Sequence, residues 1–445
     1  MITSDYSHAP IVTPEELRDL RCIADRKLSE ITLDNSPRLL IFPDSFQQSN
    51  GDLGQKEVGS IVTNSEGQEE FHTNSIVGFV GYNTTKLSIH SRFTNDGDED
   101  FFLHYMLQRV ARVNILDLKH TTTDESVFDF LIYLFPQYLK KALNQGLYKR
   151  YVSRKYNDAN VRGAIDMSRH IRYNYPFNGK VAYTTREYSY DNEVTQLIRH
   201  TIEYIDATRR EILVLDAETK EALSLIRNAT PSYELRDRRT VIGKNLRSIA
   251  HPYYSEYTAL QRLCLQILRQ EELKFGADSD EIYGILIDAA WLWEEYVAVV
   301  LEDSYNHYLK ERGKRFNLFD DFQQIIPDYI SKDMRIVADA KYIRLNREAR
   351  YDNEEKATAI YYKTITYMYR FCTDRAYLFY PHPENMNGET TELRIKSEQL
   401  GKNGGSITKL GLKVALNCTT FEEFVTRMKS NEREFIEEAI RYVTK

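Results

Sequence analysis

Three side chains stand out because their types and spacing could support metal-dependent chemistry. Asp339 and Lys341 are two residues apart in an apolar run, so the alternation of a β-strand places both on one face. Asp328 precedes them, directly after a proline. Two carboxylates can share one divalent cation, and their hard oxygens suit Mg²⁺. Such a cation could activate a water and neutralise the charge that develops on a phosphodiester, while the lysine orients that water or stabilises the transition state.

A hairpin must position these groups, and we expect its strands at Gln324–Ile330 and Met334–Leu345. If the turn centres on residues 332 and 333, Asp328 pairs opposite Val337. It is then a diagonal neighbour of the second aspartate, roughly 7–8 Å away at the backbone. This deduction requires an even-length turn, because a three-residue turn would move Asp328 to the other face.

An Asp-x-Lys spacing is weak evidence by itself. The same spacing recurs at Asp25–Lys27 and Asp117–Lys119, where a solvated ion pair worth under about 1 kcal/mol is the simpler interpretation. The apolar strand around Asp339 and the nearby Asp328 favour a catalytic set over a structural salt-bridge cluster.

The composition excludes several classes of protein. The 445-residue chain has a formal net charge of −7, which argues mildly against a generally basic nucleic-acid binder. No run approaches the ~18 apolar residues of a membrane span, and the first residues lack a signal-peptide pattern. The four cysteines form no CxxC pair, as expected for reduced thiols in a cytoplasmic protein. There is no P-loop, so a nucleotide-driven motor would have to be another chain.

We expect an α+β multidomain protein with three parts. These are a β-rich N-terminal domain over 1–130, a helical, basic middle domain over 131–275 and a C-terminal α/β domain over 276–445. The last part has about 165 residues, enough for its own core. Its remaining predicted elements are helices over Ile285–Tyr308, Thr358–Phe371 and Phe421–Lys445, and strands over Ala376–Tyr380, Thr391–Ile395 and Lys409–Leu416.

Apolar patterning supports the first two parts. Asn74–Tyr82 and Lys86–Phe93 alternate or run apolar between turn residues, as strands do. From Val194 to Ile205 and from Tyr257 to Leu268, apolar side chains recur every three or four residues. That period predicts amphipathic helices whose apolar stripes pack in a core.

A basic stretch with interleaved tyrosines lies in the middle part. Residues 138–175 contain nine lysines and arginines, two aspartates and six tyrosines. Basic side chains neutralise phosphates, and tyrosine stacks or hydrogen-bonds to backbone oxygens. The alternatives are a solvated basic face or a surface that packs on an acidic subunit. The residues that we expect to contact DNA are Lys149, Arg150, Arg154, Lys155 and Arg162.

A Pro-Asp pair followed by Asp-x-Lys in a hairpin, after a Glu-bearing helix, resembles the core of PD-(D/E)xK nucleases. Asp339-Ala-Lys-Tyr342 and Leu292-Trp-Glu-Glu-Tyr-Val-Ala298 look like McrC, the nuclease subunit of McrBC-type restriction systems. The resemblance runs from about residue 76 to 382, and the McrC-like subunits of LlaJI-type systems are a close variant. Three further stretches share it, namely Leu139–Tyr151, Val161–Asp166 and Tyr188–Glu193.

This resemblance implies roles for individual residues. Asp328 and Asp339 would be Mg²⁺ ligands, with the carbonyl of Ala340 as a third, and Lys341 would be the catalytic lysine. Glu294 falls where such cores place a helix carboxylate near the metal, although a solvated helix residue is the alternative.

One position departs from the family pattern. Many such cores carry Gln-x-x-x-Tyr on the following helix, and here Lys363 precedes Tyr367 at that spacing. The glutamine is absent, but a lysine there could contact a phosphate of DNA.

The resemblance therefore implies a Mg²⁺-dependent DNA endonuclease subunit of a restriction system, working with an McrB-like AAA+ GTPase that docks on residues 1–130. One rival interpretation is a non-catalytic adaptor that stimulates a partner NTPase, which would have no need for Asp328, Asp339 and Lys341 together. The other is a stand-alone repair nuclease, which would not require so large a non-nuclease portion.

Overall fold

The computed structural model describes residues 1–33, 38–43, 52–93, 100–111, 123–214, 216–247, 249, 251–269, 282–307, 316–320, 322–343, 354–384, 390–395 and 404–443. The chain forms two compact units. Unit 1 combines Met1–Val127 with Asp278–Lys445, and unit 2 is Phe128–Ala277. Unit 1 thus contains both the segment predicted to be β-rich and the segment that carries Asp339. No helix in the described ranges is long and apolar enough to cross a membrane.

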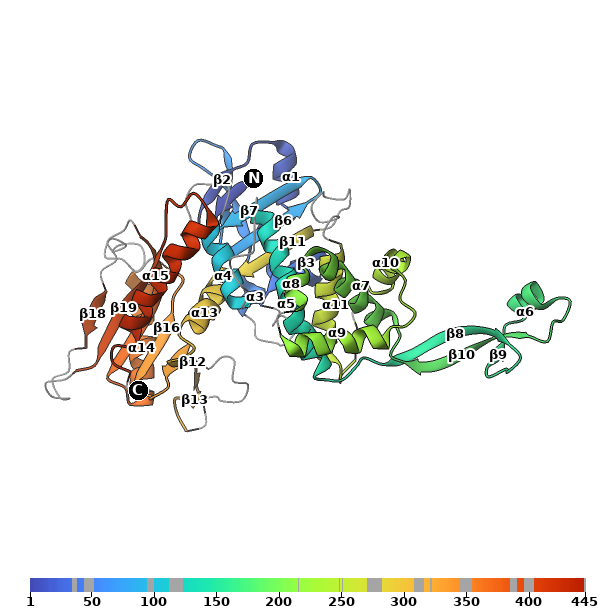
Figure 1. The fold of residues 1–445 in the computed structure, drawn as a ribbon. Helices are drawn as coiled ribbons and strands as arrows, with labels where there is room; N and C mark the ends of the chain where they lie inside the picture. The colour runs from blue at the N-terminus through green and yellow to red at the C-terminus, as the bar shows by residue number, and fades with distance from the viewer. Residues whose placement is uncertain are drawn as a thin grey trace. The chain divides into compact units, whose positions relative to one another are not determined.

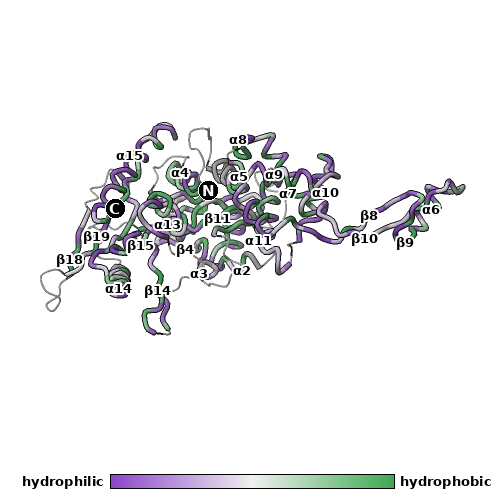
Figure 2. Tube along the Cα trace, turned by 60° about the horizontal axis from the view of Figure 1, so that its bottom comes forward, coloured by the Kyte–Doolittle hydropathy of each residue, from purple (hydrophilic) through white to green (hydrophobic). Residues whose placement is uncertain are grey.

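The first sheet of unit 1 has five strands in the order β1-β7-β6-β11-β3. β11 pairs antiparallel with β6 and parallel with β3, so a strand from the second half of the chain completes a sheet of the N-terminal segment. Apolar residues concentrate in β11 (Figure 2). The strands expected at 74–82 and 86–93 are confirmed. The bounds, in sheet order, are Ile2–Ser4, Thr85–His90, Ile76–Tyr82, Ile282–Asp288 and Arg38–Phe42.

Two glycines let β6 and β11 pair closely. A Cβ added at Gly78, where φ is +114°, would lie 2.2 Å from the carbonyl oxygen of Ile285. One added at Gly284, where φ is +140°, would lie 2.3 Å from the carbonyl oxygen of Phe79. Only glycine adopts these angles without strain and leaves room for the opposing backbone.

The helix expected over Ile285–Tyr308 is wrong at both ends. Residues up to Asp288 belong to β11, α13 spans Ala289–Val300, and β12 follows at Tyr305–His307. An apolar run that is buried on both faces has the same appearance in a strand and in a helix. The boundary is set by Asp288, whose carboxylate accepts a hydrogen bond from the N–H of Ala290 at 3.1 Å and caps the helix.

The second sheet of unit 1 has six strands in the order β12-β15-β16-β17-β19-β18. β16, β17 and β19 are parallel, and β17 is almost wholly buried, as is usual for central strands of such sheets. The strands and helices expected after residue 354 are confirmed. The bounds are Tyr329–Ser331 for β15, Ile336–Ala340 for β16, Arg375–Pro383 for β17, Thr391–Arg394 for β18, Ser406–Val414 for β19, Glu354–Phe371 for α14 and Phe421–Ala439 for α15.

Smaller elements complete unit 1. β2, β4 and β5 form a three-stranded sheet, and β13 and β14 form a short hairpin. The bounds are His8–Pro10, Gly59–Thr63 and Glu69–Thr73 for the sheet, Phe316–Asn317 and Gln324–Ile325 for the hairpin, and Pro14–Leu20, Leu28–Leu33, Asp52–Gln55 and Phe101–Ala111 for helices α1 to α4.

A buried carboxylate joins three helices of unit 1. Glu432 of α15 accepts hydrogen bonds from the hydroxyls of Tyr105 of α4, at 2.9 Å, and Tyr296 of α13, at 2.7 Å. The guanidinium of Arg109 supplies the counter-charge at 3.2 Å. Because a buried charge is tolerated only when it is paired and hydrogen-bonded, this cluster fixes α13 against its neighbours.

Unit 2 has a helical part, as the apolar stripes predicted. α7 and α11 pack their stripes together, and the side chains from Val194 to Ile205 and from Tyr257 to Leu268 are largely buried. The helix bounds are Thr123–Leu143 for α5, Glu193–Thr208 for α7, Arg210–Leu213 for α8, Ala217–Ala229 for α9, Arg238–Lys244 for α10 and Ser255–Leu268 for α11.

The helical prediction for this region misses a β-structure, which we call the arm. Two nine-residue strands, β8 and β10, pair antiparallel along their whole length, with β9 beside them and α6 near the tip. The arm extends away from the helices of unit 2 (Figure 1). Its strands have no continuous apolar face, so the usual period-two signal is absent. The bounds are Arg150–Asp158 for β8, Ala164–Ile165 for β9, Met167–Asn174 for α6 and Val181–Ser189 for β10.

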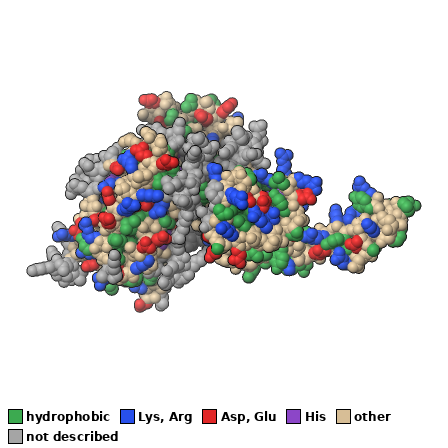
Figure 3. Space-filling model, in the orientation of Figure 1, with side chains coloured by type: hydrophobic (Ala, Val, Ile, Leu, Met, Phe, Trp, Pro, Cys, Tyr) green, Lys and Arg blue, Asp and Glu red, His purple; other side chains and the backbone are tan. Residues whose placement is uncertain are grey.

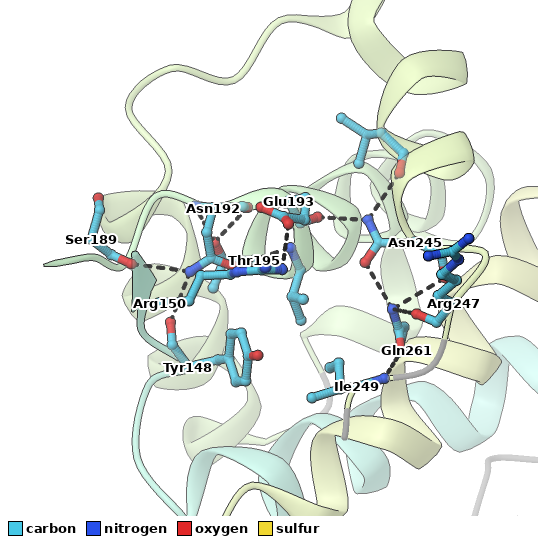
Figure 4. A network of polar contacts seen from close by, with 12 residues as sticks. Tyr148, Arg150, Ser189, Asn192, Glu193, Thr195, Asn245, Arg247, Ile249 and Gln261 are labelled. Atoms are coloured by element: carbon cyan, nitrogen blue, oxygen red, sulfur yellow. Dashed lines mark hydrogen bonds and ion pairs between the residues drawn. The ribbon is translucent and has the colours of Figure 1, made fainter. Parts of the chain in front are cut away.

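Buried amides anchor the arm to the helices (Figure 4). Asn192 caps α7 through Val194 N–H, at 3.1 Å, and its amide nitrogen donates to the carbonyl of Tyr148 at 3.1 Å. Asn245 donates to the carbonyl of Glu193 at 2.8 Å, which ties α10 to the same helix end. The base of the arm is therefore fixed by hydrogen bonds inside unit 2.

Candidate active site

Asp328 and Asp339 lie opposite each other on the hairpin of β15 and β16. Ile330 pairs with Val337, and continuing this register places Asp328 across from Asp339. The predicted pairing of Asp328 with Val337 is therefore wrong by two residues. The turn centres one residue later than expected, where Met334 adopts a φ of +61°. A shift of two residues keeps every side chain on its face, so both carboxylates still point the same way.

The pKa values of the two carboxyl groups shift in opposite directions. Burial, the charge of Asp339 and the charge of Glu294 raise the pKa of Asp328 well above its usual value. Burial would also raise the pKa of Asp339, but the ammonium of Lys341, a hydrogen bond from Asp328 and the charge of Lys363 together outweigh it, and the pKa is lowered. Lys341 forms an ion pair with Asp339, which is only 1% exposed. Asp328 therefore keeps its proton to a higher pH than Asp339, whose carboxylate lies beside an ammonium.

Lys363 brings a second positive charge to the site. Its Nζ lies 3.9 Å from Oδ1 of Asp339 and 5.4 Å from the centroid of the Tyr367 ring. The lysine side chain is 49% exposed, so it can reach a ligand as well as the carboxylate. Tyr367 is buried and donates its hydroxyl to the carbonyl of Ile326 at 2.8 Å. The lysine that replaces the expected glutamine thus lies at the edge of the carboxylate pair.

The oxygens around Asp339 fit a hard divalent cation. The buried carboxylate of Asp339 forms ion pairs with Lys341 and, at 3.9 Å, with Lys363. The Nζ of Lys341 contacts both this carboxylate and, at 3.2 Å, the carbonyl of Ala340, so one cation could contact both as well. Asp328 receives the N–H of Ala340 at 2.7 Å, which fixes its carboxyl group. Within the described ranges no three acidic, His or Cys side chains form a metal cluster. A cation here would therefore rely on two carboxylates, a carbonyl and water, as Mg²⁺ commonly does.

Glu294 has a partner that the sequence did not indicate. Nε2 of His307 lies 2.8 Å from Oε1 of Glu294, and both side chains are largely buried. Tyr329, which pairs with His307 across β12 and β15, donates its hydroxyl to the carbonyl of Glu294. His307 was missed because strand β12 pairs with β15 across a long connection, and no local spacing signals that contact.

Two of the five residues predicted to contact DNA lie at the base of the arm. Nζ of Lys149 is 4.7 Å from the ring centroids of both Tyr188 and Tyr190. Arg150 forms an ion pair with Glu193 (Figure 4). Their positive charges are thus engaged with aromatic and acidic side chains of unit 2.

The other three lie along the arm. Arg154 is 3.5 Å from Asp191, and Arg162 donates through Nε to the hydroxyl of Tyr183 at 3.2 Å. Lys155 is exposed. Figure 3 shows lysine and arginine side chains along the arm and hydrophobic ones at its tip. All five residues belong to unit 2, whereas the carboxylate pair belongs to unit 1.

The fold and the site define an α+β protein with a buried carboxylate pair and a lysine at the end of a parallel strand. Its sequence matches the family model of the McrBC 5-methylcytosine restriction system component over residues 71–381. Because this match spans more than half of the chain, the protein belongs to that family. The McrC-like resemblance inferred from the sequence is confirmed.

Two solved structures from Thermococcus gammatolerans are similar to this chain. One is a half-complex from a tetradecameric assembly of McrB AAA+ hexamers with bound McrC, at 15% identity and a TM-score of 0.43, covering 99% of this chain and 100% of that chain. The other is an McrBC complex solved by electron cryo-microscopy, at 16% identity and a TM-score of 0.31, covering 68% of this chain and 87% of that chain. A comparison with curated proteins found no significant match.

Proposed function

We propose that this chain is the nuclease subunit of an McrBC-type restriction system and hydrolyses phosphodiester bonds of DNA with Mg²⁺. The observation that carries the proposal is the placement of Asp328 and Asp339 opposite each other, with Lys341 paired to Asp339. Burying two carboxyl groups together costs free energy that a metal or a shared proton must offset.

Each residue of the carboxylate site has its own role in this proposal. Asp328, Asp339 and the carbonyl of Ala340 would hold the cation. When bound, Mg²⁺ supplies a water of lowered pKa and neutralises charge on the phosphate. Once released from Asp339, Lys341 would orient the attacking water or stabilise the developing negative charge. Glu294 completes the negative rim of the site.

Two basic surfaces would hold the DNA backbone in this proposal. Lys363 lies at the edge of the carboxylate pair, half exposed, and is suited to a phosphate next to the scissile bond. The arm offers Lys155 and Arg162 on exposed positions. If the arm instead packs on an acidic partner, charge reversal at Lys155 would reduce stimulation of that partner and leave DNA affinity unchanged.

The partner in this proposal is an McrB-like AAA+ GTPase. One of the solved complexes contains McrB AAA+ hexamers with bound McrC, and this chain has no P-loop of its own. We keep residues 1–130 as the proposed docking segment, and cytoplasm as the proposed compartment of the complex.

The test is cleavage of plasmid DNA by the purified chain with Mg²⁺, with and without the partner and GTP. Lys341→Met should abolish nicking and leave the fold intact, since it removes an ammonium that is partly exposed. Asp303→Ala, an exposed change in the loop after α13, is the matched control and should cleave like the wild-type protein. Cleavage by Lys341→Met at the wild-type rate would contradict the assignment.

A non-catalytic adaptor is the second candidate, and one observation favours it. Lys341 contacts both oxygens that would otherwise ligate the metal, as in a purely structural ion pair. An adaptor would stimulate GTP hydrolysis by the partner and cut no DNA under any condition. A stand-alone repair nuclease, in contrast, would cut at full rate without partner or GTP.

A further inference from the structure

A cavity of 430 Å³ lies between the β13–β14 hairpin and α14 in unit 1. One wall comes from the β13–β14 hairpin and includes Phe319 and Ile325, and the other comes from α14 and includes Thr366 and Tyr367. Its volume falls in the range of about 300–1,000 Å³ that is usual for sites of small organic groups.

The cavity shares its walls with the proposed catalytic site. Lys363 lines the cavity and lies 3.9 Å from Asp339. Ile326 lines it too, receives the Tyr367 hydroxyl, and is two residues before Asp328. A phosphate at the carboxylate pair would therefore have its neighbouring nucleotide at the mouth of this cavity.

The β13–β14 hairpin carries two phenylalanine side chains that are largely exposed rather than packed in the core. Phe319 is 52% exposed and Phe322 is 66% exposed, although both are large apolar side chains. Their rings stack with centroids 4.8 Å apart and planes at 23°, so Phe322 supports Phe319 from outside the cavity. Gln323 and Gln324 line the same wall with amide groups that can both donate and accept hydrogen bonds.

These features together match the chemistry of a nucleobase. A base has a flat face that stacks on an aromatic ring and a polar edge that hydrogen-bonds to amides, and its phosphate needs a cation. The cavity supplies Phe319 for the face, Gln323 and Gln324 for the edge, and Lys363 for the phosphate. A purely apolar ligand would make no use of the lysine or of the amides.

We propose that this cavity receives a nucleobase of the DNA strand next to the phosphate that is cut. The base leaves its neighbours in the stack and packs against Phe319, and Lys363 contacts the adjoining phosphate. This inference rests on the proposed nuclease function, because the cavity matters only if DNA reaches the carboxylate pair.

The experiment uses the full chain with DNA duplexes that carry the fluorescent base 2-aminopurine at alternating positions, in Ca²⁺ in place of Mg²⁺ to allow binding without cleavage. The fluorescence of 2-aminopurine rises when the base leaves the stack. Phe319→Ala removes the wall, Thr366→Phe fills the cavity from α14, and Tyr369→Ala changes an aromatic side chain on α14 that is 83% exposed and outside the cavity. Plasmid cleavage in Mg²⁺ is measured in parallel.

We expect the wild-type protein and Tyr369→Ala to raise the fluorescence, and both cavity variants to give a smaller rise. The KM for DNA should increase by on the order of tenfold for Phe319→Ala, since stacking on an aromatic side chain contributes that much. Equal fluorescence and equal KM for the wild-type protein and both cavity variants, with cleavage intact, would overturn the base site and leave the nuclease function standing. Absence of cleavage by the wild-type protein with partner and GTP would instead remove the function on which the inference rests.

Discussion

Mg²⁺ binding at the carboxylate pair should release a proton, and Asp328→Asn should abolish that release. Burial and the neighbouring negative charges raise the pKa of Asp328, so its carboxyl group holds its proton to a higher pH than an ordinary aspartate does. Asp339, whose pKa is lowered, is already ionised. A divalent cation needs both groups ionised, so binding must expel the proton of Asp328.

The number of protons released and the pH dependence of the Mg²⁺ affinity follow from proton linkage. At pH values below the raised pKa of Asp328, about one proton leaves for each Mg²⁺ bound, and the affinity increases by up to about tenfold for each pH unit, or about 1.4 kcal/mol. Isothermal titration calorimetry in two buffers of different ionisation enthalpy measures the proton count directly. Repeating the titration at several pH values gives the slope of the affinity.

The Asp328→Asn variant tests whether the released proton comes from Asp328 or from a group on the surface. In Asp328→Asn the amide copies the shape of the protonated carboxyl group, so the fold should persist while Mg²⁺ affinity falls and proton release disappears. Asp303→Asn, in an exposed loop, is the control and should behave like the wild-type protein. Wild-type binding without proton release and without pH dependence would refute the reasoning.

Further predictions concern neighbouring and distant residues. His307→Phe keeps a ring against Tyr329 but removes the contact to Glu294, so kcat for cleavage should fall about tenfold with KM unchanged; an unchanged kcat would show that the pair is only structural. In unit 2, burial, with help from Arg238, lowers the pKa of His200 to about 4. As the pH falls below about 6.5, the histidine is therefore protonated in the unfolded chain before it is protonated in the folded one. The free energy of unfolding should fall by about 3 kcal/mol between pH 6.5 and pH 4. In His200→Leu, the free energy of unfolding measured with denaturant should depend less on pH. Gly284→Ala should cost more than about 1 kcal/mol, since a Cβ would clash with the carbonyl of β6, and a wild-type unfolding midpoint would contradict the predicted clash.

The face shared by the two carboxylates could be predicted from the sequence, but their register could not. Alternation along a strand has a period of two residues, so it places Asp328 and Asp339 on one face for any even turn. Whether Asp328 lies opposite Val337 or opposite Asp339 depends on where the turn centres. That depends on Met334 adopting a positive φ, which its residue type does not indicate.

Contacts between segments that are far apart in the chain could not be predicted from the sequence either. The run Ile285–Asp288 is buried on both faces, and only its pairing with β6 and β3 makes it a strand. His307 reaches Glu294 because β12 pairs with β15. Lys363, in contrast, was found from the family resemblance, because it stands where many such cores carry the glutamine of Gln-x-x-x-Tyr.

The arm escaped prediction for a different reason. The residues from Arg150 to Asp158 alternate, but between exposed and half-buried polar or aromatic side chains rather than between apolar and polar ones. A hairpin that extends away from the helices has no core to bury, so hydrophobic periodicity carries no signal there. The basic and tyrosine-rich composition of the region was visible, and the structure places it on this arm.

The most direct test of the central claim compares the wild-type protein with Asp339→Ala, each with an McrB-like partner, GTP, Mg²⁺ and plasmid DNA, and follows DNA cleavage and GTP hydrolysis in the same reaction. We predict that Asp339→Ala cuts at least about a hundredfold more slowly, because it loses a metal ligand and the counter-charge of Lys341. Stimulation of GTP hydrolysis should be unchanged, which shows that the variant folds and binds its partner. Cleavage by Asp339→Ala at the wild-type rate would contradict the assignment of this carboxylate pair as the catalytic centre.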